Sequence, residues 1–198
     1  MSRTPCRNRG DRKVWYMPMT KVMKEMIKTR LYLLVVLCLT YFVITFIGQR
    51  LKVEGASMES TLYDGDNLIV DKISYRFEEP QRFDIIIFPF HPENKIFIKR
   101  IIGLPGETVR IDDHGNIYIN DELLEESYGK EVIRPENVGI AAEPVLLGED
   151  EYFVMGDNRN NSKDSRAGAV GNIHRNDIIG RVWIRIWPFS EFGVLKQK

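Results

Sequence analysis

One uncharged segment constrains this chain more than any other feature. Residues 31–48 contain no Asp, Glu, Lys or Arg, and as an α-helix they would extend about 27 Å. Because the hydrocarbon core of a bilayer is about 30 Å thick, this length favours a single membrane-spanning helix. A cleavable signal peptide is disfavoured, since the bulky Phe46 stands where its cleavage site needs a small residue. We therefore expect residues 31–48 to anchor the chain in a membrane.

The charges on the two sides of this segment are unequal. The chain has 28 basic and 28 acidic residues, yet residues 1–30 hold nine basic side chains against only Asp11 and Glu25. By the positive-inside rule, residues 1–30 are a cytoplasmic tail and residues 49–198 form an extracytoplasmic domain. The basic tail suits contact with the anionic phospholipid bilayer. The acidic balance of the remainder argues against a nucleic-acid binder.

The part that follows the anchor has the short apolar runs of a mainly β protein. Seven runs rich in Ile, Val, Phe and Trp are bounded by Gly, Pro, Asn or Asp. The predicted strands are residues 67–72, 84–90, 95–102, 108–112, 116–120, 152–155 and 178–187. We expect an antiparallel, barrel-like β domain tethered by one N-terminal transmembrane helix. Residues 121–150 hold nine acidic and two basic groups, and we interpret them as an excursion from the sheet rather than a second core.

Ser57 is the first candidate site residue. It lies nine positions after Gly48, the end of the predicted anchor, so even a fully extended chain keeps Ser57 within about 30 Å of the bilayer. Taken alone, a serine that follows Gly55 and Ala56 is more often a turn residue than a nucleophile. Any chemistry at Ser57 would take place near the membrane surface.

Lys99 is the second candidate and lies in the predicted strand 95–102. The alternation of a strand places Lys99 between Phe97 and Ile101 on one face and Arg100 on the other. A lysine has an ordinary pKa of about 10.4 and cannot accept a proton from serine at neutral pH, but burial lowers that pKa. A lysine that reaches to solvent along the strand is the favoured interpretation of this segment alone.

Residues 156–166 are the third segment of interest. They are too polar for a strand and too rich in turn formers for a helix, so we expect a loop held by side-chain hydrogen bonds. Within it, Asp164 and Arg166 could pair, and Ser162 could hydrogen-bond a neutral lysine. On this segment alone, a solvated surface loop is the favoured alternative.

Together the three segments resemble those of the type I signal peptidases, the membrane-anchored serine peptidases of bacteria. Residues 57–62 read Ser-Met-Glu-Ser-Thr-Leu and match the family pattern Ser-Met-x-Pro-Thr-Leu at every position but the proline. Residues 65–72, 99–107 and 156–166 are similar to the next strand of the family, its lysine segment and its Gly-Asp-Asn-Arg segment. The resemblance spans roughly residues 53–188, and the ordered set of motifs is more specific than any one of them.

The resemblance implies a Ser-Lys dyad in which Ser57 attacks the scissile carbonyl and neutral Lys99 takes its proton. Ser162 would orient the lysine amine, and the Ser57 N–H would meet the oxyanion. The remaining implied site residues are Gly55 and Met58 at the oxyanion hole and substrate cleft, and Asp157, Asp164 and Arg166 in the supporting loop. Many family members carry a Ser or Thr hydroxyl where this chain has Gly55, so the second oxyanion donor stays open.

The resemblance also implies a substrate class and a place of action. The substrates would be secretory preproteins with small residues at positions −1 and −3, cut at the outer face of the cytoplasmic membrane. No metal ion or organic cofactor is implied. Cys6 and Cys38 are the only cysteines, so a disulfide framework and a cysteine zinc site are excluded. The sequence does not indicate an oligomeric state.

Two alternatives remain open at this point. A Ser-His-Asp hydrolase could use His91, His114 or His174, although no motif surrounds them. A membrane-anchored β domain could instead act without catalysis, as a binding or assembly module in secretion or pilus biogenesis. Cleavage of a secretory precursor by the detergent-solubilised protein distinguishes the peptidase from the binding module.

Overall fold

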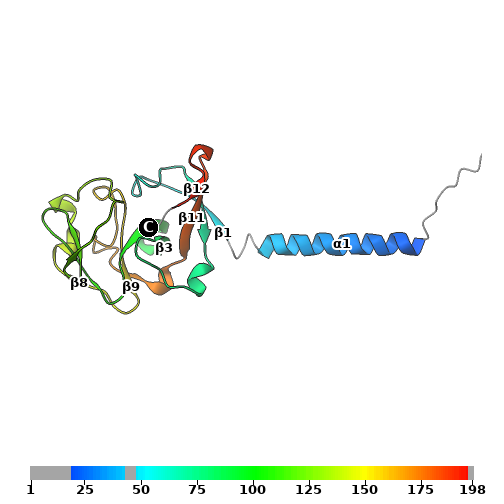
Figure 1. Cartoon of the computed structure of the whole chain (residues 1–198), viewed down its shortest axis with the longest axis horizontal. Coiled ribbons are helices and arrows are strands. Elements are labelled where there is room, and N and C mark those ends of the chain that lie inside the picture. Colours follow the sequence, from blue (N-terminus) through cyan, green and yellow to red (C-terminus); the bar gives the residue numbers. More distant parts are fainter. Residues whose placement is uncertain (1–18, 43–47, 196–198) are drawn as a thin grey trace, which may run out of the picture. The chain divides into compact units, whose positions relative to one another are not determined.

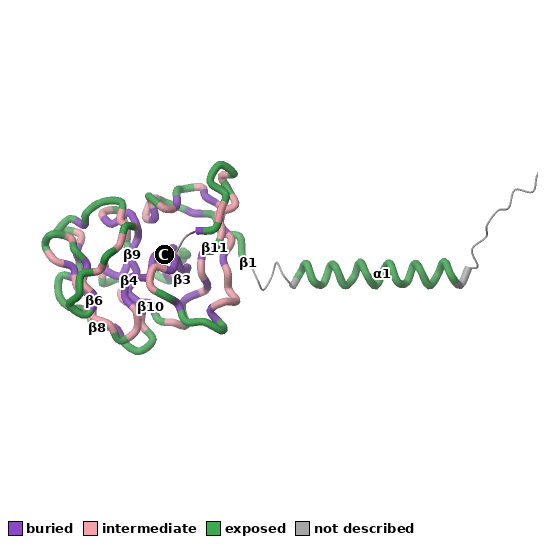
Figure 2. The backbone as a smooth tube through the Cα atoms, in the orientation of Figure 1, coloured by how far each residue is buried: buried purple, intermediate pink, exposed green. Residues whose placement is uncertain are grey.

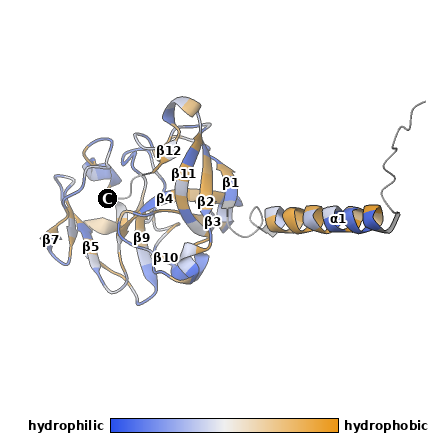
Figure 3. Cartoon of the chain, turned by 45° about the vertical axis from the view of Figure 1, so that its right-hand side comes forward, coloured by the Kyte–Doolittle hydropathy of each residue, from blue (hydrophilic) through white to orange (hydrophobic). Residues whose placement is uncertain are grey.

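In a computed structural model the chain divides into two compact units, residues 1–42 and 43–198. The structure describes residues 19–42 and 48–195 (Figure 1). The described part of the first unit is one helix, α1 (Met19–Phe42). Its residues after Arg30 are uncharged, and hydrophobic colours predominate there in Figure 3.

The predicted membrane span, residues 31–48, is only partly described. Residues 31–42 belong to α1, and residues 43–47 lie outside the described part of the chain. Gly48 begins strand β1 (Gly48–Lys52) and pairs with Asp71. Within residues 19–42 and 48–195, no helix is both long and apolar enough to cross a membrane. The transmembrane anchor stays a prediction.

The second unit is built on two antiparallel sheets. The larger follows the order β1-β2-β11-β3-β4-β9-β10, with β12 on β11, and the smaller follows β7-β6-β5-β8. The further strands of the larger sheet are β2 (Asn67–Asp71), β3 (Ile85–Phe90), β4 (Lys95–Gly103), β9 (Glu151–Met155), β10 (Ile173–His174), β11 (Gly180–Trp187) and β12 (Gly193–Val194). Those of the smaller are β5 (Thr108–Ile111), β6 (Ile117–Ile119), β7 (Glu122–Leu123) and β8 (Val145–Leu146). The predicted mainly β, antiparallel class is confirmed.

Short 3-10 helices connect many of these strands. They are η2 (Ser74–Arg76), η3 (His91–Glu93), η4 (Pro135–Asn137), η5 (Gly139–Ala142), η6 (Arg175–Asp177) and η7 (Phe189–Glu191). Each of the seven predicted strands is present and ends within two residues of its predicted bounds. The sequence missed β1 because it is polar and adjoins the apolar segment. It missed β7, β8, β10 and β12 because each of these strands has only two residues, too few to show an alternation of apolar and polar side chains.

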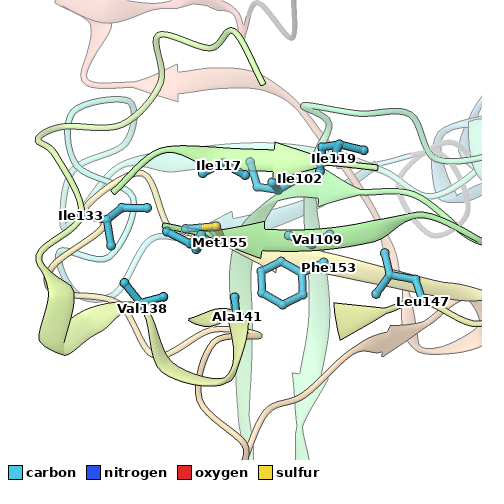
Figure 4. Close-up of a cluster of buried hydrophobic side chains, with 11 residues drawn as sticks. Ile102, Val109, Ile117, Ile119, Ile133, Val138, Ala141, Leu147, Phe153 and Met155 are labelled. Atoms are coloured by element: carbon cyan, nitrogen blue, oxygen red, sulfur yellow. The ribbon is translucent and has the colours of Figure 1, made fainter. Parts of the chain in front are cut away.

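Among the described residues, buried side chains form three apolar clusters, and buried residues follow β3, β4 and β9 in Figure 2. One cluster packs β5 and β6 of the small sheet against β4 and β9 of the large one (Figure 4). Residues 121–150 lie outside the large sheet, and their apolar side chains join a core that is shared with β4, β5, β6 and β9. They supply Ile133, Val138, Ala141 and Leu147 to this cluster. Isolated apolar residues in an acidic, aperiodic segment gave no pattern that would predict this packing.

The contribution of residues 121–150 to the core can be tested at two neighbouring positions. The Ile133 side chain is 3% exposed and the Val132 side chain is 71% exposed. We expect Ile133→Ala to lower the free energy of unfolding by about 2–5 kcal/mol, because it removes buried methylene groups and leaves a cavity. The matched Val132→Ala should change it by less than about 0.5 kcal/mol. Urea unfolding of the detergent-solubilised chain measures both, and equal effects would contradict a core role for this segment.

Candidate active site

The candidate site is assembled on β4, which lies between β3 and β9 in the large sheet. Ser57 is in the loop between β1 and β2, and Lys99 is in the middle of β4. Strand β4 pairs with β9 through Arg100 and Met155, so the loop that follows β9 from Gly156 begins beside Lys99 and Arg100. The register of the sheet therefore brings residues 156–166 to the lysine.

Lys99 and Ser57 form a direct hydrogen bond. The distance from Lys99 Nζ to Ser57 Oγ is 2.7 Å, and Lys99 Nζ also donates to the Ile98 carbonyl oxygen at 3.0 Å. The nitrogen lies 5.0 Å from the centre of the Phe97 ring, and only 3% of Lys99 is exposed. The alternative of a lysine that reaches to solvent is wrong, because the loop that carries Ser57 covers the amine.

Burial changes the acid-base chemistry of this lysine. It lowers the pKa of Lys99 from an ordinary value of 10.5 to about 8, because an ammonium group loses its hydration when it is enclosed. The charges of Asp164 and Asp157 partly offset this by favouring the ammonium, and Arg166 adds to the lowering of the pKa. Neutral lysine is therefore available close to physiological pH, within hydrogen-bond distance of a hydroxyl group.

The neighbouring cation on β4 is also buried, but it has a carboxylate partner. Arg100 donates from Nε to Asp157 Oδ1 at 2.8 Å and from its terminal nitrogen to Asp157 Oδ2 at 2.6 Å. Thr61 donates to the same carboxylate at 2.6 Å, and the guanidinium stacks 3.7 Å from the centre of the Tyr128 ring. This two-bond pair fixes the loop after β9 to β4 and, through Thr61, to the loop of Ser57.

A second ion pair closes the loop of residues 156–166 on itself. Arg166 makes two hydrogen bonds of 2.8 Å to the Asp164 carboxylate, which also accepts the Gly156 N–H at 3.0 Å. Arg166 further donates to the carbonyl oxygens of Arg159 and Asn137. Asp157, Asp164 and Arg166 are all buried. The solvated-loop alternative is therefore wrong: Asp157 bonds to Arg100 and Thr61, and Asp164 and Arg166 bond to each other.

Ser162 differs from its predicted geometry. Its hydroxyl oxygen is buried and has no hydrogen-bond partner in the described part of the chain, so the expected bond to Lys99 is not made. The oxygen lies against Gly156, beside the Ser57 carbonyl oxygen. In this structure Lys99 bonds to Ser57 and Ile98 in place of Ser162.

The dyad opens onto a cavity of about 450 Å³. Gly55, Ser57, Met58 and Lys99 line it, as do Phe97 and Ile98 of β4. Gly55 has a φ of 88°, and its N–H donates to Asp64 at 2.8 Å, so the Gly55 N–H is already engaged. Met58 is buried in the apolar cluster beneath the cavity. The structure therefore places both predicted cleft residues at the cavity, with Ser57 between them.

Arg100, Thr61, Gly156 and Asn158 were not among the predicted site residues. A structural ion pair of Arg100 could have been predicted from the sequence. Strand alternation places its charge between Ile98 and Ile102 on an apolar face, and a buried guanidinium needs a carboxylate partner. The roles of Thr61 and Asn158 depend on contacts with partners about a hundred residues away. No local pattern predicts such contacts.

The three histidines do not form a catalytic triad. His91, His114 and His174 are exposed. The one histidine side-chain hydrogen bond within residues 19–42 and 48–195 joins His174 to Asp150 at 3.4 Å. No serine hydroxyl in this part of the chain is bonded to an imidazole, so the Ser-His-Asp alternative is disfavoured.

A serine hydroxyl bonded to a buried lysine of lowered pKa, at a cavity in a β domain, is the arrangement of a serine hydrolase with a lysine base. A family model described as "Signal peptidase, peptidase S26" matches residues 23–187. The chain therefore belongs to the signal peptidase family, peptidase S26, and is a serine peptidase of the signal peptidase I type.

Named relatives agree with this assignment. The chain is 40% identical over 159 residues to a probable signal peptidase I-2 of Synechocystis, covering 76% of this chain and 68% of the relative. It is 42% identical over 161 residues to signal peptidase I of Leptolyngbya laminosa, covering 76% and 74%. A crystal structure of signal peptidase I from Enterococcus faecalis is 36% identical, covers 52% of this chain and 97% of that one, and has a TM-score of 0.44. The two named relatives from Synechocystis and Leptolyngbya do not support the alternative of a non-enzymatic binding module.

The close contact at Gly156 leads to a mutational prediction. A methyl group on Gly156 would overlap the Ser57 carbonyl oxygen and Ser162 Oγ. We expect Gly156→Ala to lower the free energy of unfolding by about 1–3 kcal/mol and to displace Ser57, with at least about a tenfold loss of peptidase activity. Gly168→Ala is the matched control, because its new methyl group would meet only Ile140 at 4.0 Å. Equal activities of the two variants would contradict the proposed contact.

The lowered pKa of Lys99 predicts a pH-dependent stability. Between about pH 8 and 10.5 the unfolded lysine binds a proton that the folded one does not, so the free energy of unfolding rises with pH. Relative to Lys99→Met, wild type should gain about 3 kcal/mol over this window. Urea unfolding of both proteins at pH 7.5 and pH 10.5 measures this difference. A difference that stays constant with pH would mean that Lys99 titrates normally.

Proposed function

We propose that this protein removes signal peptides from secretory preproteins, with Ser57 as the nucleophile and Lys99 as the general base. The observation that carries the proposal is the 2.7 Å hydrogen bond between Lys99 Nζ and Ser57 Oγ at the wall of the cavity. Membership of the signal peptidase family supports the reaction and the substrate class. The residue assignment rests on the matching segments and on this geometry.

The acylation step moves one proton and two electron pairs. Ser57 Oγ forms a bond to the scissile carbonyl carbon while its proton passes to Lys99 Nζ, and the carbonyl π pair moves to the oxygen. When the tetrahedral intermediate collapses, the C–N bond breaks and the Lys99 ammonium gives its proton to the leaving amine. A water molecule, deprotonated by the same lysine, then hydrolyses the ester bond to Ser57.

The Ser57 N–H is the proposed donor to the oxyanion. It donates no hydrogen bond to any residue within the described ranges, so it is available for the substrate. A donor fixed in advance stabilises the charge that develops on the carbonyl oxygen. Gly55 offers no donor to the oxyanion, because it has no side-chain hydroxyl group and its own N–H donates to Asp64.

We propose that Ser162 acts on Lys99 at a later stage. Once Ser57 Oγ is bonded to the substrate carbon, Lys99 needs a new partner that keeps its amine near the ester. Ser162 Oγ is a buried hydroxyl beside Ser57 and Gly156 that makes no hydrogen bond to the described residues, which supports this role. An unpaired buried hydroxyl destabilises the folded state, so its presence in a native structure calls for an explanation such as a role in the reaction.

The proposed substrates carry small residues at positions −1 and −3. Support comes from the family resemblance and from the cavity, in which Gly55, Met58 and Phe97 surround Ser57. A cavity of about 450 Å³ suits a short extended segment with small side chains better than a bulky one.

The proposed place of action is the outer face of the cytoplasmic membrane. The predicted anchor and the basic residues before it support an N-terminus in the cytoplasm. Exposed aromatic side chains near the C-terminal end of the β domain add support, because such residues favour the interface between membrane and water. They are Trp183, Trp187, Phe189 and Phe192. The ring centres of Trp187 and Phe189 are 4.9 Å apart, so these two residues form a continuous apolar surface.

The pH dependence of cleavage tests the lysine base. We expect kcat/KM for a secretory precursor to rise with pH to a midpoint near 8, because only neutral Lys99 accepts the serine proton. Ser57→Ala and Lys99→Met should each lose at least about a thousandfold in kcat, since the nucleophile and its base act as a unit. The measurement is precursor cleavage by detergent-solubilised protein between pH 6 and 10.

The control for this experiment is a variant with all three histidines replaced by glutamine. It should keep both the activity and the rise with pH, because the histidines are exposed and make no contact with Ser57. An active Lys99→Met protein, or a wild-type rate independent of pH from 6 to 9, would contradict the dyad.

A further inference from the structure

We propose that Asn158 is a positioning residue that aims the Ser57 N–H at the oxyanion. The inference rests on the proposed function, because it concerns the same reaction at Ser57. Asn158 is buried in the loop after β9, and it makes two hydrogen bonds to the loop of the nucleophile. Its backbone N–H donates to the Ser57 carbonyl oxygen at 3.1 Å, and its side-chain Nδ2 donates to the Ala56 carbonyl oxygen at 3.0 Å.

The bond to Ala56 bears directly on the oxyanion donor. The Ala56 carbonyl and the Ser57 N–H belong to one planar peptide unit, and this unit is trans. In a trans unit the C=O and N–H bonds point in opposite directions. A hydrogen bond that holds the Ala56 oxygen on the side of Asn158 therefore turns the Ser57 N–H away from Asn158. That N–H has no partner among the described residues.

The second bond holds the other side of the nucleophile. The Asn158 N–H fixes the Ser57 carbonyl, so the peptide units before and after Ser57 are both tied to one residue. The Ala56 oxygen also accepts the Glu59 N–H at 3.2 Å, and this local bond remains when the Asn158 side chain is changed. We therefore expect a change at Asn158 to loosen the orientation of the Ser57 N–H without unfolding the loop.

Asn158 is itself firmly held. The preceding residue, Asp157, is bound to Arg100 and Thr61, and its carbonyl oxygen accepts the N–H groups of Arg159 and Lys130. Gly156 lacks the side chain that would separate the two loops at this point. A donor on a rigid support keeps a reacting group within the narrow range of positions that catalysis requires.

Asn158→Leu tests the proposal because it keeps the branching of the side chain and removes the Nδ2 donor. We expect kcat for precursor cleavage to fall about ten- to hundredfold, with KM changed by less than about threefold, because the lost orientation matters most in the transition state. The pH midpoint near 8 should stay, since Lys99 is untouched. A peptide aldehyde, whose adduct with Ser57 places an oxyanion in the same position, should lose affinity by the same factor as kcat/KM.

Asn160→Leu is the matched control in the same loop. Its side chain bonds the Val132 carbonyl oxygen at 2.8 Å and accepts from the Arg134 N–H, so it supports the loop without touching Ser57 or Ala56. This variant should lose stability, yet its folded fraction should keep the wild-type kcat and aldehyde affinity. Asn158→Asp is a second test, because it keeps the shape and replaces the donor with an acceptor that faces the Ala56 oxygen. It should lower kcat at least as much as Asn158→Leu.

The outcomes separate this inference from the proposed function. Wild-type kcat and aldehyde affinity in both Asn158 variants would overturn the positioning role while the peptidase assignment stands. An equal fall of kcat per folded molecule in Asn158→Leu and Asn160→Leu would also overturn it, since the effect would then be one of general loop support. Failure of the wild-type protein to cleave any secretory precursor would overturn the proposed function and this inference with it.

Discussion

The site depends on the different partners of two adjacent buried cations on β4. Arg100 has a carboxylate in contact, because Asp157 offers both of its oxygens to the guanidinium. Lys99 has no carboxylate in contact among the residues that the structure describes: its nitrogen bonds to a serine hydroxyl and a carbonyl oxygen. A buried cation with a carboxylate partner stays charged and holds structure together, whereas one without a partner gives up its proton more readily. One strand thus supplies both the support of the site and the proposed base.

The same ion pair connects the parts of the domain that must act together. Asp157 joins β4 to the loop after β9, and Thr61 extends the contact to the loop of Ser57. The excursion after β7 covers the other side of this loop, because Lys130 donates its N–H to the Asp157 carbonyl oxygen and Asn160 binds the Val132 carbonyl oxygen. Loss of the Asp157 carboxylate would leave Arg100 buried and unpaired, a change that costs about 3–5 kcal/mol in known cases.

Much of this arrangement could be predicted from the sequence, and the rest could not for physical reasons. The strands could be predicted because strands bury alternate residues. The segments that contain Ser57 and Lys99 could be recognised as local motifs. The burial of Lys99 could not be predicted, because it depends on the loop of Ser57, forty-two residues earlier in the chain, and on the packing of the Phe97 ring near the lysine nitrogen. The predicted bond from Ser162 to Lys99 is absent because Ser57 takes that place. The contribution of Ile133 to a core could not be predicted either, because it stands in an acidic segment whose apolar residues follow no helical or strand period.

Burial lowers the pKa of Lys99 to about 8, so a fraction of Lys99 is neutral near physiological pH while its amine bonds to Ser57. The most direct test is a nuclear magnetic resonance titration of the detergent-solubilised chain with ¹³C-labelled lysine side chains, in which the signal that disappears in Lys99→Met identifies Lys99. The structure predicts a midpoint near pH 8 for that signal, well below the ordinary lysine value of about 10.4. A midpoint for Lys99 within a few tenths of that ordinary value would contradict a lysine base at this site.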